Sequence, residues 1–185
     1  MRAVRRSVLV ALAATSLTLI GSIAHAAATR GKATPALTDA NIAAIVVAAN
    51  TIDIDNGHLA LQKSTNESVK SFAQQMVTDH TSVNEKATAL ATKLSLTPRP
   101  NGTSRSLLAT TKAKRARMAR LSGAAFDKAY LDNEIAYHQS VIDMLRDKLV
   151  PGAQNAELKD LLTSVQPAFD AHLAHAKETR AALKE

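Results

Sequence analysis

The sequence contains no cysteine and no tryptophan, and only 3% of its 185 residues are aromatic. Without cysteine, the chain has no disulfide, no cysteine nucleophile, no thiolate zinc site and no lipid-modified N-terminal cysteine. Six glycines and five prolines are too few for a sandwich or barrel of short strands joined by tight turns. Hydrophobic residues still make up 46% of the chain, which is enough for one domain with a sizeable core. Long helices with alanine-rich packing faces fit this composition best.

Residues 1–26 have the pattern of a secretory signal peptide. Three arginines near the start precede the uncharged, mostly apolar stretch Ser7–Ile23, and Ala24-His25-Ala26 supplies small residues for cleavage after Ala26. The alternative is a retained membrane anchor, because the apolar stretch is close to the minimum span of about 17 residues. We therefore expect a periplasmic or secreted protein that contacts a membrane only through an uncleaved signal peptide.

Residues 27–37 are expected to be flexible, and residues 38–185 to form one all-α domain. Apolar residues recur there at helical spacing in four long segments. These segments run from Thr38 to Lys63, from the capping-box motif Ser64-Thr65-Asn66-Glu67 to about Leu94, from about Ser122 to about Val150 and from Asn155 almost to the C-terminus. Pro167 is expected to kink the last. The pattern predicts a ferritin-like four-helix bundle, in which a long connection joins the second helix to the third.

That long connection is strongly basic. Between Glu85 and Asp127 there are nine basic residues and no acidic one, and Ser104–Leu121 could form a short helix. A solvated crossover helix is one interpretation. The functional alternative is binding to an anionic envelope surface through Lys112, Lys114, Arg115, Arg117 and Arg120. Nucleic acid is not expected, because aromatic stacking residues are missing from this stretch.

Titratable residues interrupt the apolar stripe of each long helix. They are Asp53, His80, Glu134, His138 and His172. If the third helix begins at the end where the first two helices join, a rise of about 1.5 Å per residue places all five within roughly 6 Å of one level. Imidazole and carboxylate groups are ligands for Zn, Fe or Cu, so these residues are candidate metal ligands. Asn56, Asp79 and Tyr130 are candidate supporting residues. A buried Asp–His hydrogen-bond network and a metal-free proton relay are the alternatives.

A ferritin-like di-iron centre also needs a glutamate three residues before each histidine of two helices. The corresponding residues here are Val77 and Phe169, so both bridging glutamates are missing. We therefore expect no di-iron oxidase and at most one metal ion.

A set of ordered motifs resembles the exported bacterial family called domain of unknown function 4142. The motifs are Asp53-Ile-Asp-Asn-Gly-His-Leu-Ala60, Phe72-Ala73 followed by Met76-Val-Thr-Asp-His80, Leu121-Ser-Gly-Ala-Ala-Phe-Asp-Lys-Ala-Tyr130, His138, and Pro167 with His172. The resemblance spans about Leu37 to Leu183. It implies a ferritin-like, envelope-associated four-helix bundle and no established reaction; the family usually has Glu where this chain has Asp53.

The sequence thus favours an exported helical-bundle protein with a binding or stress-related role and a metal ion in its core, rather than an enzyme. A metal-dependent redox enzyme is the first alternative. The second is a structural envelope protein that binds anionic surfaces without metal.

Overall fold

The computed structural model describes residues 36–183. The expected signal peptide and almost all of the segment 27–37 lie outside this range. Within it the protein is all-helical, as expected, and contains no strand. No helix among the described residues is long and apolar enough to cross a membrane.

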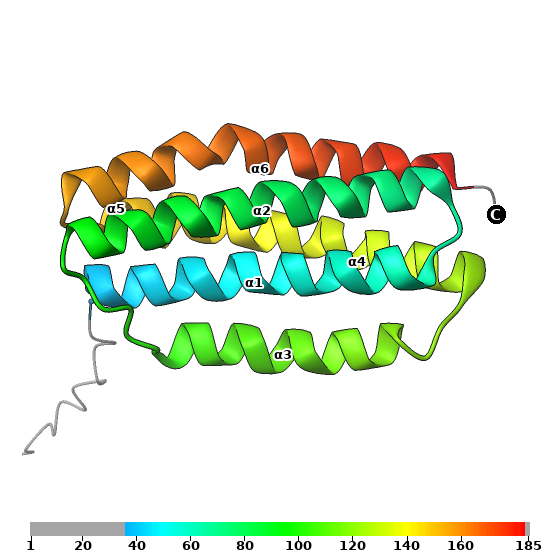
Figure 1. Cartoon of the computed structure of the whole chain (residues 1–185), viewed down its shortest axis with the longest axis horizontal. Helices are drawn as coiled ribbons and strands as arrows, with labels where there is room; N and C mark the ends of the chain where they lie inside the picture. The colour runs from blue at the N-terminus through cyan, green and yellow to red at the C-terminus, as the bar shows by residue number, and fades with distance from the viewer. Residues whose placement is uncertain (1–35, 184–185) are drawn as a thin grey trace, which may run out of the picture. The chain divides into compact units, whose positions relative to one another are not determined.

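Within residues 36–183, five helices of 17 residues or more make up the fold (Figure 1). They are α1 (Asp39–Lys63), α2 (Glu67–Lys93), α3 (Gly102–Met118), α4 (Gly123–Met144) and α6 (Ala156–Ala182). Side-chain caps begin most of them: Thr38 caps α1, Asn66 caps α2, Asn101 caps α3 and Asn155 caps α6. The expected helix starts at Thr38 and Asn155 are therefore confirmed to within a residue. The second helix does not use the capping box expected at Ser64–Glu67, because its cap is Asn66, whose side chain accepts from the N–H groups of Ser68 and Val69.

The end of the third long helix differs from the expected continuous helix to Val150. After α4, one π-helical turn, η1 (Leu145–Leu149), leads into the short α5 (Val150–Gly152). The N–H of Val150 bonds to the carbonyl of Leu145, five residues back. The wider turn comes directly before Pro151, which has no N–H to continue the α-helical pattern. The last helix, in contrast, continues through Pro167.

The path of the chain places the starts of α2 and α4 at the same end of the fold (Figure 1). α1 and α2 form a hairpin, and α3 runs back alongside α1 to the end where that hairpin turns. α4 therefore begins at the same end as α2, and α6 pairs with α4 and α2. The expected short helix of the basic connection is α3, which begins two residues earlier and ends three residues earlier than Ser104–Leu121.

The core of α1, α2, α4 and α6 consists of two apolar clusters. One contains Ile42, Ile52, Val141 and Phe169, and the other contains Ala60, Phe72, Met76 and Tyr130. Along each of the four helices, one buried titratable residue falls between the segments that build the two clusters: Asp53, His80, Glu134 and His172. The fold therefore places one polar layer in the middle of an apolar core.

Candidate metal centre

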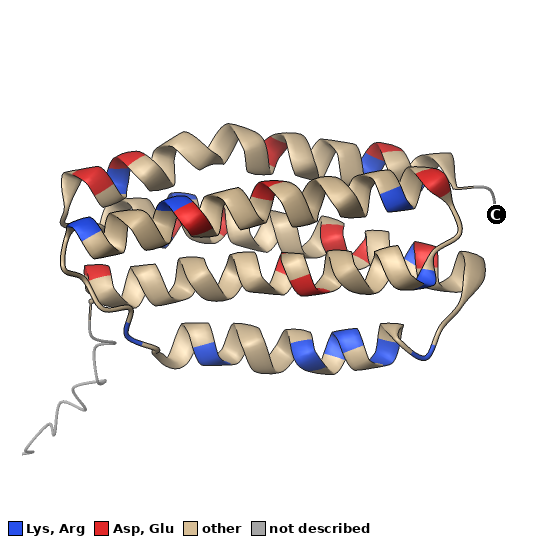
Figure 2. Cartoon of the chain, viewed as in Figure 1, with Lys and Arg blue, Asp and Glu red and all other residues tan. Residues whose placement is uncertain are grey.

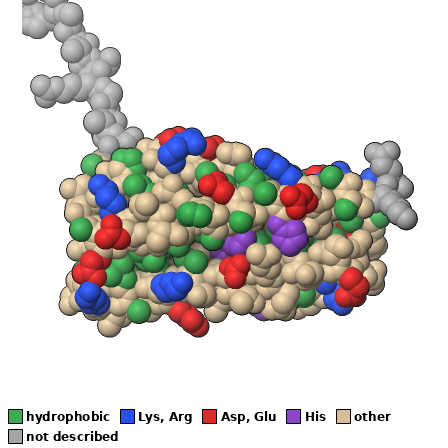
Figure 3. All heavy atoms as spheres, turned by 90° about the horizontal axis from the view of Figure 1, so that it is seen from above, with side chains coloured by type: hydrophobic (Ala, Val, Ile, Leu, Met, Phe, Trp, Pro, Cys, Tyr) green, Lys and Arg blue, Asp and Glu red, His purple; other side chains and the backbone are tan. Residues whose placement is uncertain are grey.

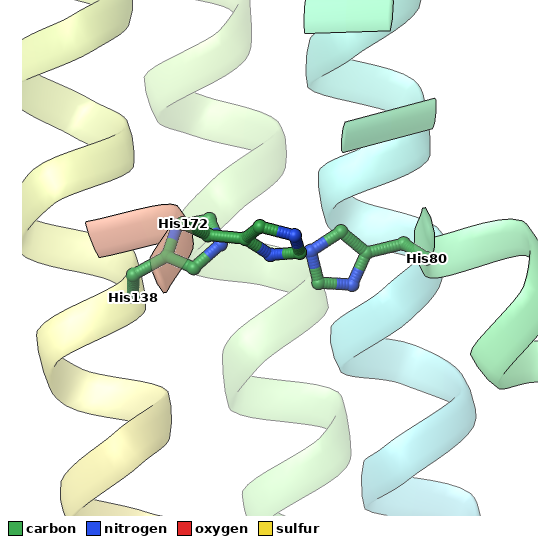
Figure 4. Close-up of side chains that lie close together, drawn as sticks. All are labelled: His80, His138 and His172. Carbon is green, nitrogen blue, oxygen red and sulfur yellow. The ribbon is translucent and has the colours of Figure 1, made fainter. Parts of the chain in front are cut away.

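Three histidines from three helices meet in this polar layer (Figure 4). His80 comes from α2, His138 from α4 and His172 from α6. Their ring centroids lie 5.3–5.6 Å apart, and their exposed fractions are 0%, 0% and 3%. One ring nitrogen from each lies within 4.8 Å of the nitrogens of the other two. That is the spacing of a set of donors that could hold a metal ion.

Each ring is oriented by a hydrogen bond on its outer side. The His138 Nδ1–H donates to the backbone carbonyl of Glu134 at 3.0 Å, and the His172 Nε2–H donates to Asp79 Oδ2 at 2.9 Å. His80 Nδ1 lies 2.8 Å from Asn50 Oδ1. The Asn50 amide N–H donates to the carbonyl of Val46, so its oxygen faces His80 and accepts from Nδ1. All three outer nitrogens are thus donors.

The inner nitrogens are consequently lone-pair acceptors. They are Nε2 of His80, Nε2 of His138 and Nδ1 of His172, and none has a hydrogen-bond partner within residues 36–183. Three acceptors cannot satisfy one another, since none carries a proton to donate. An outer hydrogen bond that fixes the tautomer and leaves the inner nitrogen free is the usual arrangement around metal-bound histidines.

Burial keeps the imidazoles neutral. It lowers the pKa of His138 from 6.5 to about 4, and it lowers the pKa of His80 well below its ordinary value, with a smaller contribution from the neighbouring rings. The pKa of His172 is also lowered by burial, against the opposing effect of its bond to Asp79. Neutral imidazole is the form that binds metal ions.

Two buried carboxyl groups lie beside the histidines. Asp53 of α1 and Glu134 of α4 are 1% and 0% exposed, and each offers an oxygen within 4.8 Å of the other and of a His138 nitrogen. Asp53 Oδ2 is 3.5 Å from His80 Nε2, too long for a good hydrogen bond. Burial raises the pKa of Asp53 well above its ordinary value and that of Glu134 to about 7. In the absence of a metal ion, the contact between Asp53 and His80 therefore joins two neutral groups and is not an ion pair.

The structure therefore brings together all five candidate ligands named from the sequence, in two overlapping groups of three. Of the candidate supporting residues, Asn56 donates to Glu134 Oε1 at 3.2 Å and Asp79 binds His172. Tyr130 is wholly buried, but its hydroxyl forms no hydrogen bond with any described residue.

Two contributors were missed by the sequence analysis. Asn50 orients His80, and Asn133 donates to Glu134 Oε1 at 3.3 Å. A signal for Asn50 existed: it precedes Asp53 by three residues, a spacing that puts both on one helix face.

The expected basic surface lies on α3, along which Figure 2 shows lysines and arginines but no acidic residue. Lys112, Lys114, Arg117 and Arg120 are exposed. Arg115 is half-buried and pairs with Asp55 of α1 at 2.7 Å. Four of the five candidate basic residues are thus exposed to a possible partner, while the fifth, Arg115, also attaches α3 to α1.

Fold and core together define an all-α protein with buried histidine and carboxyl groups that could hold a metal ion. The chain belongs to the family described as Domain of unknown function (DUF4142), whose model matches residues 24–179. The family suspected from the motifs is thereby confirmed. No curated protein and no solved structure matches the chain.

Proposed function

We propose that this protein is an exported, ferritin-like four-helix-bundle protein of the bacterial envelope that binds a metal ion in its core. The observation that carries the proposal is the set of three inward lone pairs on His80, His138 and His172, each fixed by a bond on the other side of its ring. A metal-free hydrogen-bond network fits less well, because such a network needs donors to alternate with acceptors.

A cation satisfies this arrangement better than a proton. A proton on one imidazole would fill only one of the three inward lone pairs, and burial lowers the pKa of all three rings. A divalent ion can accept all three lone pairs at once. Nitrogen donors suit Zn, Fe or Cu, so the ion is proposed from this group.

The route of the chain supports the ferritin-like assignment. α1, α2, α4 and α6 form the bundle, and α3 carries the chain along its length, so that α4 begins where α2 begins (Figure 1). Val77 and Phe169 stand where bridging glutamates would be. A binding or stress-related role is therefore proposed ahead of a di-iron oxidase. A redox enzyme using Fe or Cu is the alternative.

Elemental analysis of protein purified from the periplasm tests this function. We expect stoichiometric metal in the wild type and its loss in H80A, while H58A, which removes an exposed histidine of α1, keeps the metal. Turnover with peroxide or a reductant would favour the redox enzyme. Mass spectrometry of the whole envelope fraction tests the expected cleavage and should find Ala27 at the N-terminus. An intact N-terminus in membranes would favour the anchor.

A second candidate function is binding to an anionic envelope surface through α3. The specific observation is that four basic residues are exposed and that none of the salt bridges within residues 36–183 involves them. They are Lys112, Lys114, Arg117 and Arg120. Vesicles of phosphatidylglycerol should retain the protein, and retention should fall with added salt. Replacing these four residues with glutamine should abolish retention, while Arg115 is kept because it pairs with Asp55. Equal retention on neutral vesicles would reject this function.

A further inference from the structure

The five candidate ligands do not form one compact coordination sphere. They divide into His80, His138 and His172 on one side and Asp53, Glu134 and His138 on the other; only within each group do all ligand atoms lie within 4.8 Å of one another. Ligand atoms bound to one ion at about 2.0–2.2 Å are at most about 4.4 Å apart. The two groups therefore correspond to two neighbouring positions rather than to one.

The two carboxyl groups at the second position, those of Asp53 and Glu134, have few hydrogen-bond donors around them in the protein. Both oxygens of Asp53 and Oε2 of Glu134 are buried, and apart from a hydrogen bond between the two carboxyl groups themselves, which needs a proton on one of them, no hydrogen bond from the described part of the chain reaches them. The two amide groups nearby, from Asn56 and Asn133, both donate to Oε1 of Glu134. Buried carboxyl oxygens of this kind need a proton, a donor or a cation.

A further oxygen atom lies beside this position. Asn56 Oδ1 is also buried, and it has no partner among residues 36–183. Asn56 is held against Glu134 by its own amide. The first position offers three imidazole nitrogens, whereas the second offers mainly oxygen atoms, from two carboxyl groups, with one nitrogen of His138. Oxygen donors suit harder cations such as Mn²⁺, and nitrogen donors suit Zn²⁺.

We propose that Asp53 and Glu134 form a second cation subsite, which takes a hard divalent ion such as Mn²⁺ beside the ion held by the three histidines. This inference rests on the proposed metal-binding function and departs from the sequence-based expectation of one ion. His138 belongs to both groups, and its Nδ1 lies 3.7 Å from Oε2 of Glu134.

A shared proton is the competing occupant of the carboxyl pair. Burial raises the pKa of both groups, so a metal-free chain keeps the pair at least partly protonated near neutral pH. A cation that binds there must displace that proton, so the two occupants can be distinguished by counting bound ions.

The experiment is a metal titration of chelator-treated protein. One equivalent of Zn²⁺ is added first, followed by Mn²⁺, and bound ions are counted by elemental analysis and by the Mn²⁺ electron paramagnetic resonance signal. We expect wild type to bind one Zn²⁺ and one Mn²⁺ per chain. E134Q and D53N should each keep Zn²⁺ and lose Mn²⁺, and E85Q, which removes an exposed carboxylate of α2, should bind both ions.

Two variants are used so that a folding defect in one leaves the test intact, and circular dichroism checks the helical content of each. Wild type that binds Zn²⁺ but no Mn²⁺ would overturn the second subsite and leave the proposed function standing. So would Mn²⁺ binding that persists in folded E134Q and D53N. Wild type that binds neither ion would overturn both.

Discussion

His80 donates its Nδ1–H to Oδ1 of Asn50 at 2.8 Å, a bond between α2 and α1 that turns the other nitrogen of the ring inward. Corresponding bonds hold His138 and His172. The chemistry proposed for the core depends on these outer bonds as much as on the histidines, because they decide which nitrogen carries the proton.

The bond from His172 to Asp79 gives the first prediction. The side chain of Asp79 is 42% exposed, and it reaches His172 from α2. The surface view in Figure 3 shows, by colour alone, histidine side chains at the surface with acidic side chains near them. D79A should lower Zn²⁺ affinity by about 10–100-fold, since the ring loses the acceptor that orients it. The measurement is competition against a fluorescent chelator. D132A, which removes an exposed carboxylate paired with Arg180, should leave affinity unchanged. Equal affinities for D79A and wild type would show that the bond does not orient the ligand.

The close approach of α1 and α2 gives the second prediction. A Cβ atom at Gly57 would lie 2.7 Å from Cγ2 of Val77 and 2.9 Å from the backbone oxygen of Ala73. G57A should therefore destabilise the protein by about 1–3 kcal/mol, because the helices must move apart. Urea unfolding measures this, with G102A as the control, since a Cβ there meets nothing within 4 Å. G57A with wild-type stability would contradict the close packing.

The raised pKa of Glu134 gives the third prediction, for metal-free protein. Its pKa is about 7 in the fold, against an ordinary value of 4.5. Between these values the folded chain holds a proton that the unfolded chain has released, so stability falls as pH rises from 4.5 to 7. E134Q has no such proton. Its stability relative to wild type should therefore increase as pH rises from 4.5 to 8, by up to about 3 kcal/mol, and removal of the Glu134 contribution to the raised pKa of Asp53 acts in the same direction.

Chemical unfolding in the presence of chelator checks this pH dependence. The lowered pKa of His138 has the opposite effect, since acid favours the unfolded chain between pH 6.5 and about 4. That effect is present in both proteins and cancels in the comparison. E85Q should differ from wild type by the same amount at both pH values. A difference for E134Q that stays constant with pH would mean that Glu134 titrates normally in the fold.

The helices and the level of the candidate site could be predicted from the sequence, because both follow from fixed helix geometry. Apolar spacing gave the four long helices, and a constant rise per residue brought Asp53, His80, Glu134, His138 and His172 to one layer. The family followed from the ordered motifs.

The supporting bonds could not be predicted in the same way. Whether Asp79 reaches His172 depends on how α2 and α6 are rotated about their axes, and the sequence does not determine that rotation. Asn50 looked like one polar residue in an alanine-rich helix, and its partner lies 30 residues away. The π turn at Leu145–Leu149 similarly depends on packing near Pro151.

The central claim, a metal ion bound by the three histidines, is tested most directly by the melting temperature of chelator-treated protein with and without added Zn²⁺. At a free concentration about 100 times Kd, binding to the folded state adds about 2.7 kcal/mol, which for a chain of this size raises Tm by about 5–10 °C. The shift should vanish in H80A and persist in H58A. An identical Tm for wild type with and without Zn²⁺, and likewise with Fe²⁺ or Cu²⁺, would contradict the claim.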